Sequence, residues 1–172
     1  SPYFINDQNK MSTVFEDAYV LICNKKIDSM KDLIKPLEAV LETGKPILIV
    51  ADEIENEALQ GLVVNCVKGS LKACAIKSPA FGSARHDMLV DMSAITGAKI
   101  LSTSEDLNSF NLEDLGNCKK IIVKRSSTLF VASKSRDKNV EERIESIRKR
   151  IKSYDVDANE LDVLKYRLRQ LS

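Results

Sequence analysis

The sequence has a single histidine, no tryptophan, and no apolar run near the roughly 20 residues that a membrane-spanning helix needs. Its first residues, SPYFINDQNK, have neither the basic start nor the apolar core of a signal peptide. One histidine, His86, excludes a two-histidine metal site and leaves any catalytic triad dependent on a single loop residue. These absences disfavour a membrane protein, a histidine-rich metal site and a hydrolase.

The charges and the cysteine positions also indicate no particular partner or site. The chain has 26 basic and 25 acidic residues, so its net charge of +1 gives no reason to expect a nucleic acid or a membrane as partner. Cys23, Cys66, Cys74 and Cys118 lie far apart, which is typical of small apolar core residues in a reducing compartment. No glycine-rich phosphate-binding loop follows any apolar run, so the sequence does not predict a nucleotide-binding site.

Strand and helix patterns alternate along most of the chain. Apolar runs at YVLIC, ILIVA and KACAIK predict buried strands, and helices are predicted at 29–46, 57–69 and 88–96, with a short strand at AKIL. This alternation predicts βαβ units with parallel strands and helices on the faces of the sheet. KKIIVKRSSTLFVA predicts an antiparallel hairpin. We therefore expect a layered α/β fold with βαβ units, a β-hairpin and C-terminal helices.

The residues after Ser133 form a charged helical segment. Leucine, isoleucine and valine recur on one face of each of two helices separated by YDVDAN, and Asp157 is placed to cap the second. Each helix is polar over most of its circumference, so we expect an antiparallel pair that packs on itself or on a partner segment. The expected division is one domain over 1–135 and a helical segment over 136–172.

The helix predicted at EALQGLVVNCVKG has more apolar residues than one buried face needs. At about 100° per residue its apolar arc spans roughly 180°, whereas a surface helix needs little over 100°. The surplus packs against a second element or forms an exposed strip that binds a ligand, and periodicity alone favours the first. The arc comprises Ala58, Leu59, Leu62, Val63, Val64, Cys66 and Val67.

Asp52 and Glu53 follow the second strand, where open α/β sheets place ligand sites. Their favourable interaction with the following helix N-terminus explains them equally well. One alternative for the whole chain is therefore a doubly wound α/β ligand-binding or enzymatic domain that uses Asp52 or His86. Another is a structural part whose apolar surface is closed by its own N-terminal strand.

Several ordered blocks resemble one family. SPYFIN, LEAVLETGKPILIVADEIENEALQGLVVN, KSPAFG, MLVDMSAITGAKILS and LEDLG are together similar to the apical domain of group I chaperonins, the GroEL-type heat-shock ring proteins. The resemblance extends from Ser1 to about Val131, and the closing helices are similar to the segment that leads toward the intermediate domain. It implies a molecular chaperone domain that binds non-native polypeptides and the mobile loop of a GroES-type co-chaperonin.

The resemblance also implies which residues bind. It places Tyr3 and Phe4 on a first strand and the remaining positions on two helices that flank an apolar groove. Within the second helix, Ala58, Leu62 and Cys66 should face the sheet, so that Val63 and Val64 are partly exposed and Leu62 is not. The implied polypeptide-binding residues are Tyr3, Phe4, Ile34, Leu37, Leu59, Val63, Val64 and Asn65.

The family's ATP-binding run and hydrolytic aspartate have no counterpart in this sequence. The chain lacks an initiator methionine, and we expect it to be an internal piece of a longer protein. The resemblance implies a parent ATPase that uses ATP and Mg²⁺ and assembles with itself in a seven-membered ring, whereas this fragment holds no cofactor and has no activity. The implied location is the mitochondrial matrix, the plastid stroma or the bacterial cytoplasm.

Two features depart from the family. KSPAFGSARHD replaces a loop that normally reads Lys-Ala-Pro-Gly-Phe-Gly-Asp-Arg-Arg-Lys, so Ala80 stands where a glycine is usual. Pro36 lies one position later than in many relatives, and we expect it to kink the first helix.

Overall fold

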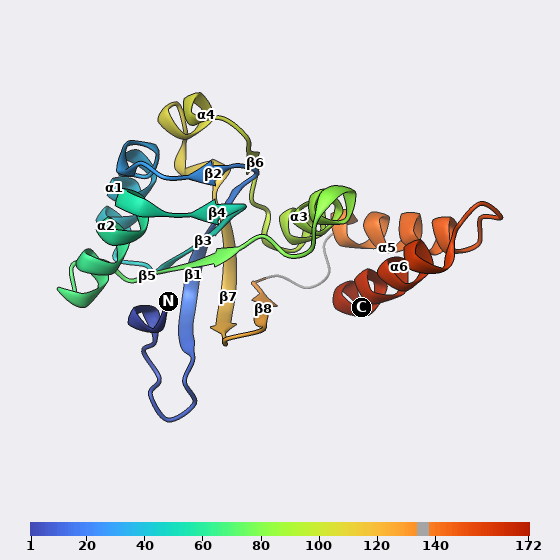
Figure 1. The fold of residues 1–172 in the computed structure, drawn as a ribbon, viewed down its shortest axis with the longest axis horizontal. Coiled ribbons are helices and arrows are strands. Elements are labelled where there is room, and N and C mark those ends of the chain that lie inside the picture. The colour runs from blue at the N-terminus through green and yellow to red at the C-terminus, as the bar shows by residue number, and fades with distance from the viewer. Residues whose placement is uncertain (134–137) are drawn as a thin grey trace.

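The computed structural model describes residues 1–133 and 138–172, which form a mixed α/β fold (Figure 1). The main sheet has the strand order β5-β3-β1-β7-β8, with the short β6 paired to the end of β1. The expected α/β class with βαβ units, a β-hairpin and C-terminal helices is confirmed. The strands are β1 (Thr13–Cys23), β3 (Ile47–Ala51), β5 (Ala73–Lys77), β6 (Ile100–Leu101), β7 (Gly116–Val123) and β8 (Thr128–Ala132).

The sheet is parallel on one side and antiparallel on the other. β1, β3, β5 and β6 run parallel, with Tyr19 opposite Ile47 and Ile47 opposite Ala73. β7 runs antiparallel to β1 and turns into β8, which confirms the hairpin around KRSS. All five residues of β3 are buried, as expected for a parallel strand covered on both faces.

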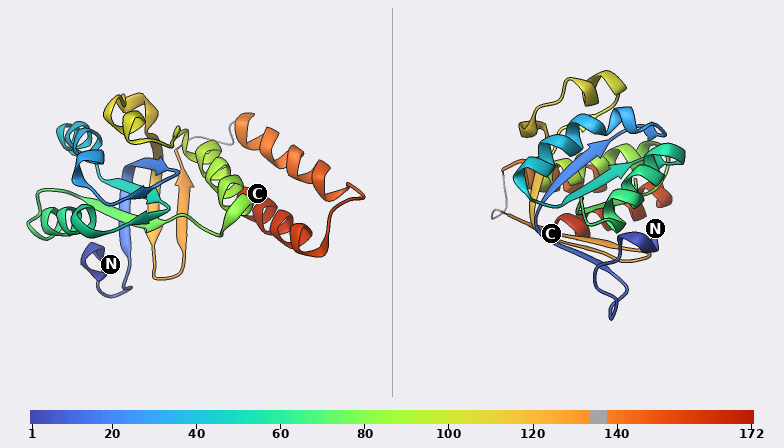
Figure 2. Two further views of the ribbon diagram at one scale, coloured as in Figure 1. Left: turned by 45° about the horizontal axis from the view of Figure 1, so that its top comes forward. Right: turned by 90° about the vertical axis from the view of Figure 1, so that its left-hand side faces the viewer.

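Helices cover both faces of this sheet. The helices α1 (Ile34–Thr43) and α2 (Asn56–Val67) lie on one face, and α3 (Gly82–Thr96) lies on the other (Figures 1 and 2). The chain passes from β1 to β3 to β5 in one direction and then returns to β6 beside β1. Right-handed crossovers therefore place α3 opposite α1 and α2.

Smaller elements complete this domain. They are the 3-10 turns η1 (Pro2–Phe4), η2 (Met30–Asp32) and η3 (Leu112–Asp114), the helix α4 (Ser104–Asn108), and the paired strands β2 (Lys26–Ile27) and β4 (Glu53–Ile54). Among the described residues, no helix is both long and apolar enough to cross a bilayer.

Two local expectations are wrong. Tyr3 and Phe4 lie in the 3-10 turn η1 and not on a strand, because Pro2 begins a turn that closes when the Ile5 amide donates to the Pro2 carbonyl. Pro36 does not kink a helix, since α1 begins only at Ile34. A proline in the first turn removes no intrahelical hydrogen bond, because the amides there have no partner.

The C-terminal helices α5 (Lys138–Ile151) and α6 (Ala158–Leu171) pack on each other and on α3. Asp157 caps α6 as expected, with its carboxylate accepting from the Glu160 amide at 2.8 Å. Their shared apolar cluster also includes Ala94 and Ile95 of α3. The expected boundary between residues 135 and 136 lies outside the described residues, so the division into two parts stays a prediction.

Candidate functional site

The predicted binding residues come from three neighbouring elements on one side of the molecule. α2 lies between α1 and the N-terminal turn η1 in two views (Figure 1 and the left panel of Figure 2). η1 contacts both α2 and the edge strand β5, and η2 contacts α2 from the other direction. The candidate site is therefore a layered surface of α1, α2 and η1.

The buried face of α2 is the one that the helical arc predicts. Ala58 and Leu62 are fully buried against the sheet, and Cys66 is half-buried with its thiol 3.5 Å from the Ala73 carbonyl oxygen. Val63 is half-buried and Val64 is exposed. The expected difference between Leu62 and its two valine neighbours is confirmed.

Gly61 determines how α2 approaches η2. A Cβ atom added to Gly61 would lie 2.6 Å from the Met30 sulfur, so the absent side chain lets Met30 pack against the α2 backbone. At 100° per residue, Leu59 and Val63 lie about 160° around the helix from Gly61. They therefore point away from η2 and α1, on the side of α2 where η1 has room to pack.

From helical spacing and the Gly61 contact we infer that the predicted site residues fall into two apolar strips, one between α1 and α2 and one between α2 and η1. Ile34 and Leu37 belong to the strip between α1 and α2, which we call the α1–α2 furrow. Leu59 and Val63 belong to the strip between α2 and η1, and Val64 lies on the ridge between the two strips. Helical spacing alone does not predict this division, because the division depends on the contact between Gly61 and Met30.

One wall of the α1–α2 furrow is a stripe along α1. Ile34, Leu37 and Leu41 recur at the three- and four-residue spacing that keeps side chains on one helix face. Leu37 is buried and the other two are exposed. Leu41 also lines a pocket of about 170 Å³ with Gly69 and Leu71, so this stripe faces the C-terminal end of α2.

Asn65 forms the polar edge of the opposite wall. Its side-chain amide donates to the Gly61 carbonyl at 2.7 Å, and its own carbonyl accepts from the Ser70 amide at 3.1 Å and the Leu71 amide at 3.3 Å. These bonds hold the turn that ends α2. The geometry thus gives Asn65 a local structural role in addition to the predicted position beside the binding surface.

Only one member of the N-terminal pair reaches the surface. Phe4 is buried in the main core, and its carbonyl accepts a 2.7 Å hydrogen bond from the Thr13 hydroxyl. Tyr3 beside it is exposed. η1 contacts α2, so the N-terminal segment lies against the second helix, and the alternative in which this segment closes the apolar surface stays a prediction.

Two exposed apolar residues, Leu41 and Val67, lie on α1 and α2 but are absent from the predicted binding residues, although Val67 belongs to the predicted apolar arc. Leu41 follows Ile34 by seven residues and Val67 follows Val63 by four, so helical spacing contains the signal for both. The exposed fractions across the surface are 64% for Tyr3, 44% for Ile34, 55% for Leu41, 47% for Val64 and 66% for Val67.

A second pocket of about 400 Å³ lies at the carboxyl ends of β3 and β5, where the enzyme alternative would place its site. Its acids are paired: Asp52 lies 3.6 Å from Arg85, and Glu53 lies 3.1 Å from Lys77. The hydrogen bond from Lys77 lowers the pKa of Glu53, so this carboxylate is a poor base at neutral pH. His86 is exposed and does not line the pocket.

The thiols offer no reactive group. Burial raises the pKa of Cys23 to about 12 and those of Cys74 and Cys118 to about 11. A thiol with so high a pKa supplies almost no thiolate at neutral pH. Within 1–133 and 138–172, no three His, Cys, Asp or Glu residues gather as a metal site.

No family model matches the chain.

Proposed function

We propose that this chain is the apical domain of a group I chaperonin, which binds non-native polypeptides and a GroES-type mobile loop. The observation that carries the proposal is the run of exposed apolar side chains across η1, α1 and α2. Contiguous apolar surface on a soluble domain marks an interaction site, whereas single exposed apolar residues need no explanation.

The physical basis for selectivity is simple. A non-native chain exposes apolar side chains that a folded protein hides, and burial of apolar area contributes about 25 cal/mol per Å². A few hundred Å² therefore separates the two kinds of guest by several kcal/mol before the costs of association. A furrow between two helices accepts a helix or an extended strand with little sequence demand.

The parent protein completes the proposal. One such surface binds weakly, and a seven-membered ring of copies raises the avidity by several orders of magnitude without any new contact. On this proposal ATP and Mg²⁺ act in parts of the parent beyond this sequence. The parent works in a mitochondrial matrix, a plastid stroma or a bacterial cytoplasm.

The test is a titration, followed by isothermal calorimetry, of a short apolar peptide that imitates a co-chaperonin mobile loop. The double variant Ile34→Asp, Val64→Asp places a charge on each helix at positions already exposed, so the fold should survive. We expect at least tenfold weaker binding. Leu129→Asp, an exposed position on β8, is the matched control and should bind like the wild type. Equal affinity for all three proteins would refute the proposal.

A second candidate is a small-ligand site in the 400 Å³ pocket. The specific observation is Ser78, whose side chain is buried and whose hydroxyl has no hydrogen-bond partner among the described residues. Unsatisfied buried hydroxyls are rare and invite a ligand. A shift in melting temperature on addition of a nucleotide or a metal ion, absent in Ser78→Ala, would support it.

A further inference from the structure

The 170 Å³ pocket lies between the C-terminal end of α1 and the segment that follows α2. Its walls come from the last turn of α1 and from the segment that follows α2. Both segments turn at glycines with left-handed backbones, Gly44 at φ 72° and Gly69 at φ 75°, and no atom lies within 4 Å of a Cβ added to either. The pocket is therefore open at these two glycines, with Leu41 and Leu71 as its apolar walls.

The size of the pocket suits one side chain. Small-molecule sites usually enclose about 300–1,000 Å³, which is more than this pocket provides. A cavity of about 150 Å³ accommodates a benzene-sized group. One leucine, methionine or phenylalanine side chain of a guest therefore fills it, and a cofactor does not.

The rim of the pocket is basic. Lys45 and Lys72 line it, and Lys68, the C-cap residue of α2, directly precedes the lining residue Gly69. Lys45 is already 3.2 Å from Asp17. Lys68 and Lys72 are exposed, and neither has an ion pair with any residue in the described ranges. Glu42, which is exposed on α1, is the acid nearest in sequence to Leu41.

We propose that this pocket is an anchor subsite for a guest segment in which an apolar residue is followed within two positions by a carboxylate. The apolar side chain enters between Leu41 and Leu71, and the carboxylate pairs with Lys68 or Lys72. This inference rests on the proposed polypeptide-binding function. It adds a preference that apolar area alone does not give, namely acidic over neutral guests of equal hydrophobicity.

Two peptides test this preference. They share one apolar sequence and differ only in a glutamate or a glutamine after the anchor residue. Because an exposed ion pair contributes only a small favourable free energy, we expect the glutamate peptide to bind wild-type protein about threefold tighter at low salt. The advantage should disappear in about 0.5 M salt, where charges are screened within a few Å.

Variants locate the effect. In Lys68→Gln, Lys72→Gln the two peptides should bind equally, whereas Lys10→Gln, an exposed lysine in the loop before β1, should keep the threefold ratio. Leu41→Gln should weaken both peptides while keeping their ratio. If both peptides bind wild type with one affinity, the anchor subsite is refuted and the proposed function stands. If neither peptide binds, the proposed function itself fails.

Discussion

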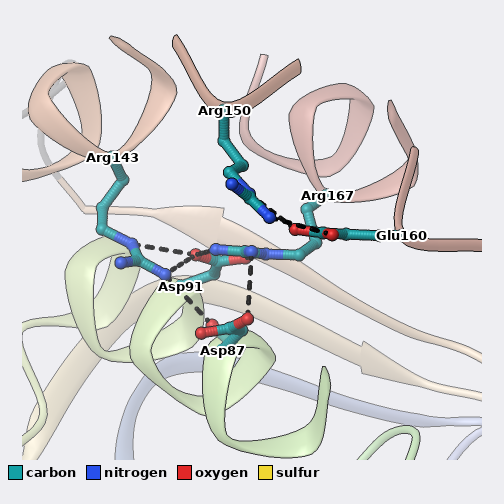
Figure 3. A network of polar contacts seen from close by, with 6 residues as sticks. All are labelled: Asp87, Asp91, Arg143, Arg150, Glu160 and Arg167. Atoms are coloured by element: carbon teal, nitrogen blue, oxygen red, sulfur yellow. Dashed lines mark hydrogen bonds and ion pairs between the residues drawn. The ribbon is translucent and has the colours of Figure 1, made fainter. Parts of the chain in front are cut away.

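Arg167 of α6 forms a two-pronged ion pair with Asp91 of α3. Its Nε lies 2.8 Å from Oδ2 and its Nη2 lies 3.1 Å from Oδ1, with both residues buried (Figure 3). Arg143 of α5 approaches the same Oδ1, with its Nη2 at 2.7 Å. One carboxylate thus joins the helix on the sheet to both C-terminal helices, and charge-assisted bonds of this geometry are the strong ones.

Loss of the Asp91 charge should be costly. Asp91→Asn leaves two arginines without their shared counter-ion, and removal of one partner from a buried pair typically costs about 3–5 kcal/mol. Urea denaturation should show this loss of unfolding free energy. Asp87→Asn is the control, because Asp87 is half-exposed and Arg167 is 3.3 Å away, so at most about 1 kcal/mol is expected. Similar losses in both variants would contradict a buried hub at Asp91.

The close approach of Gly61 and Met30 predicts an energetic coupling. Gly61→Val should lower the free energy of unfolding by about 1–3 kcal/mol, because the new side chain overlaps the Met30 sulfur. Met30→Ala should restore part of that loss, since it removes the overlapping atoms. A double-mutant cycle by chemical denaturation should give a coupling of about 1 kcal/mol or more. Additive effects would mean that α2 and η2 do not touch at this point.

The sequence predicts the sheet better than the surface, and the reason is physical. Runs such as ILIVA are apolar because both faces of a central parallel strand are covered, so the pattern and the burial have the same cause. Asp91 looks like any surface acid, because its partners are distant in sequence. Likewise, no local sequence signal indicates that Gly61 contacts Met30. The assignment of each apolar residue of α2 to one strip or the other therefore depends on the tertiary structure.

Backbone strain is predicted at Ala80. This residue has φ 60°, in the left-handed region, where an L-residue costs roughly 1–2 kcal/mol. Ala80→Gly removes that strain, but glycine loses more conformational entropy on folding, which costs about 0.5–1 kcal/mol. We expect a net stabilisation of about 0.5–1 kcal/mol in thermal or urea unfolding. Gly82→Ala, at φ 59°, is the reverse control and should destabilise the protein.

The hydrogen bonds that cap α4 should make part of the free energy of unfolding sensitive to acid. Hydrogen bonds from the Ser102 amide and from Thr103 lower the pKa of Asp106 in the folded state. A lowered folded-state pKa gives stability that is full above the ordinary aspartate pKa of about 4 and is lost as the pH falls through the folded value. Urea midpoints at neutral pH and at about pH 3 should therefore differ less in Asp106→Asn than in wild type. If the difference in urea midpoint between the two pH values is the same in both proteins, protonation of Asp106 does not contribute to acid unfolding.

The N-terminal turn offers a test of which apolar strip is available to a guest. Tyr3 is exposed and Phe4 is buried, although they are neighbours in η1. Tyr3→Ala should leave the unfolding free energy nearly unchanged and weaken binding of the apolar peptide, because it removes exposed apolar surface.

Phe4→Ala should lower the free energy of unfolding by about 3–5 kcal/mol, because it truncates a core side chain. It should also increase binding of an apolar-surface dye, because η1 would no longer cover the strip that contains Leu59 and Val63. If dye binding is the same in Phe4→Ala and wild type while stability falls, η1 does not act as a cover over the strip that contains Leu59 and Val63.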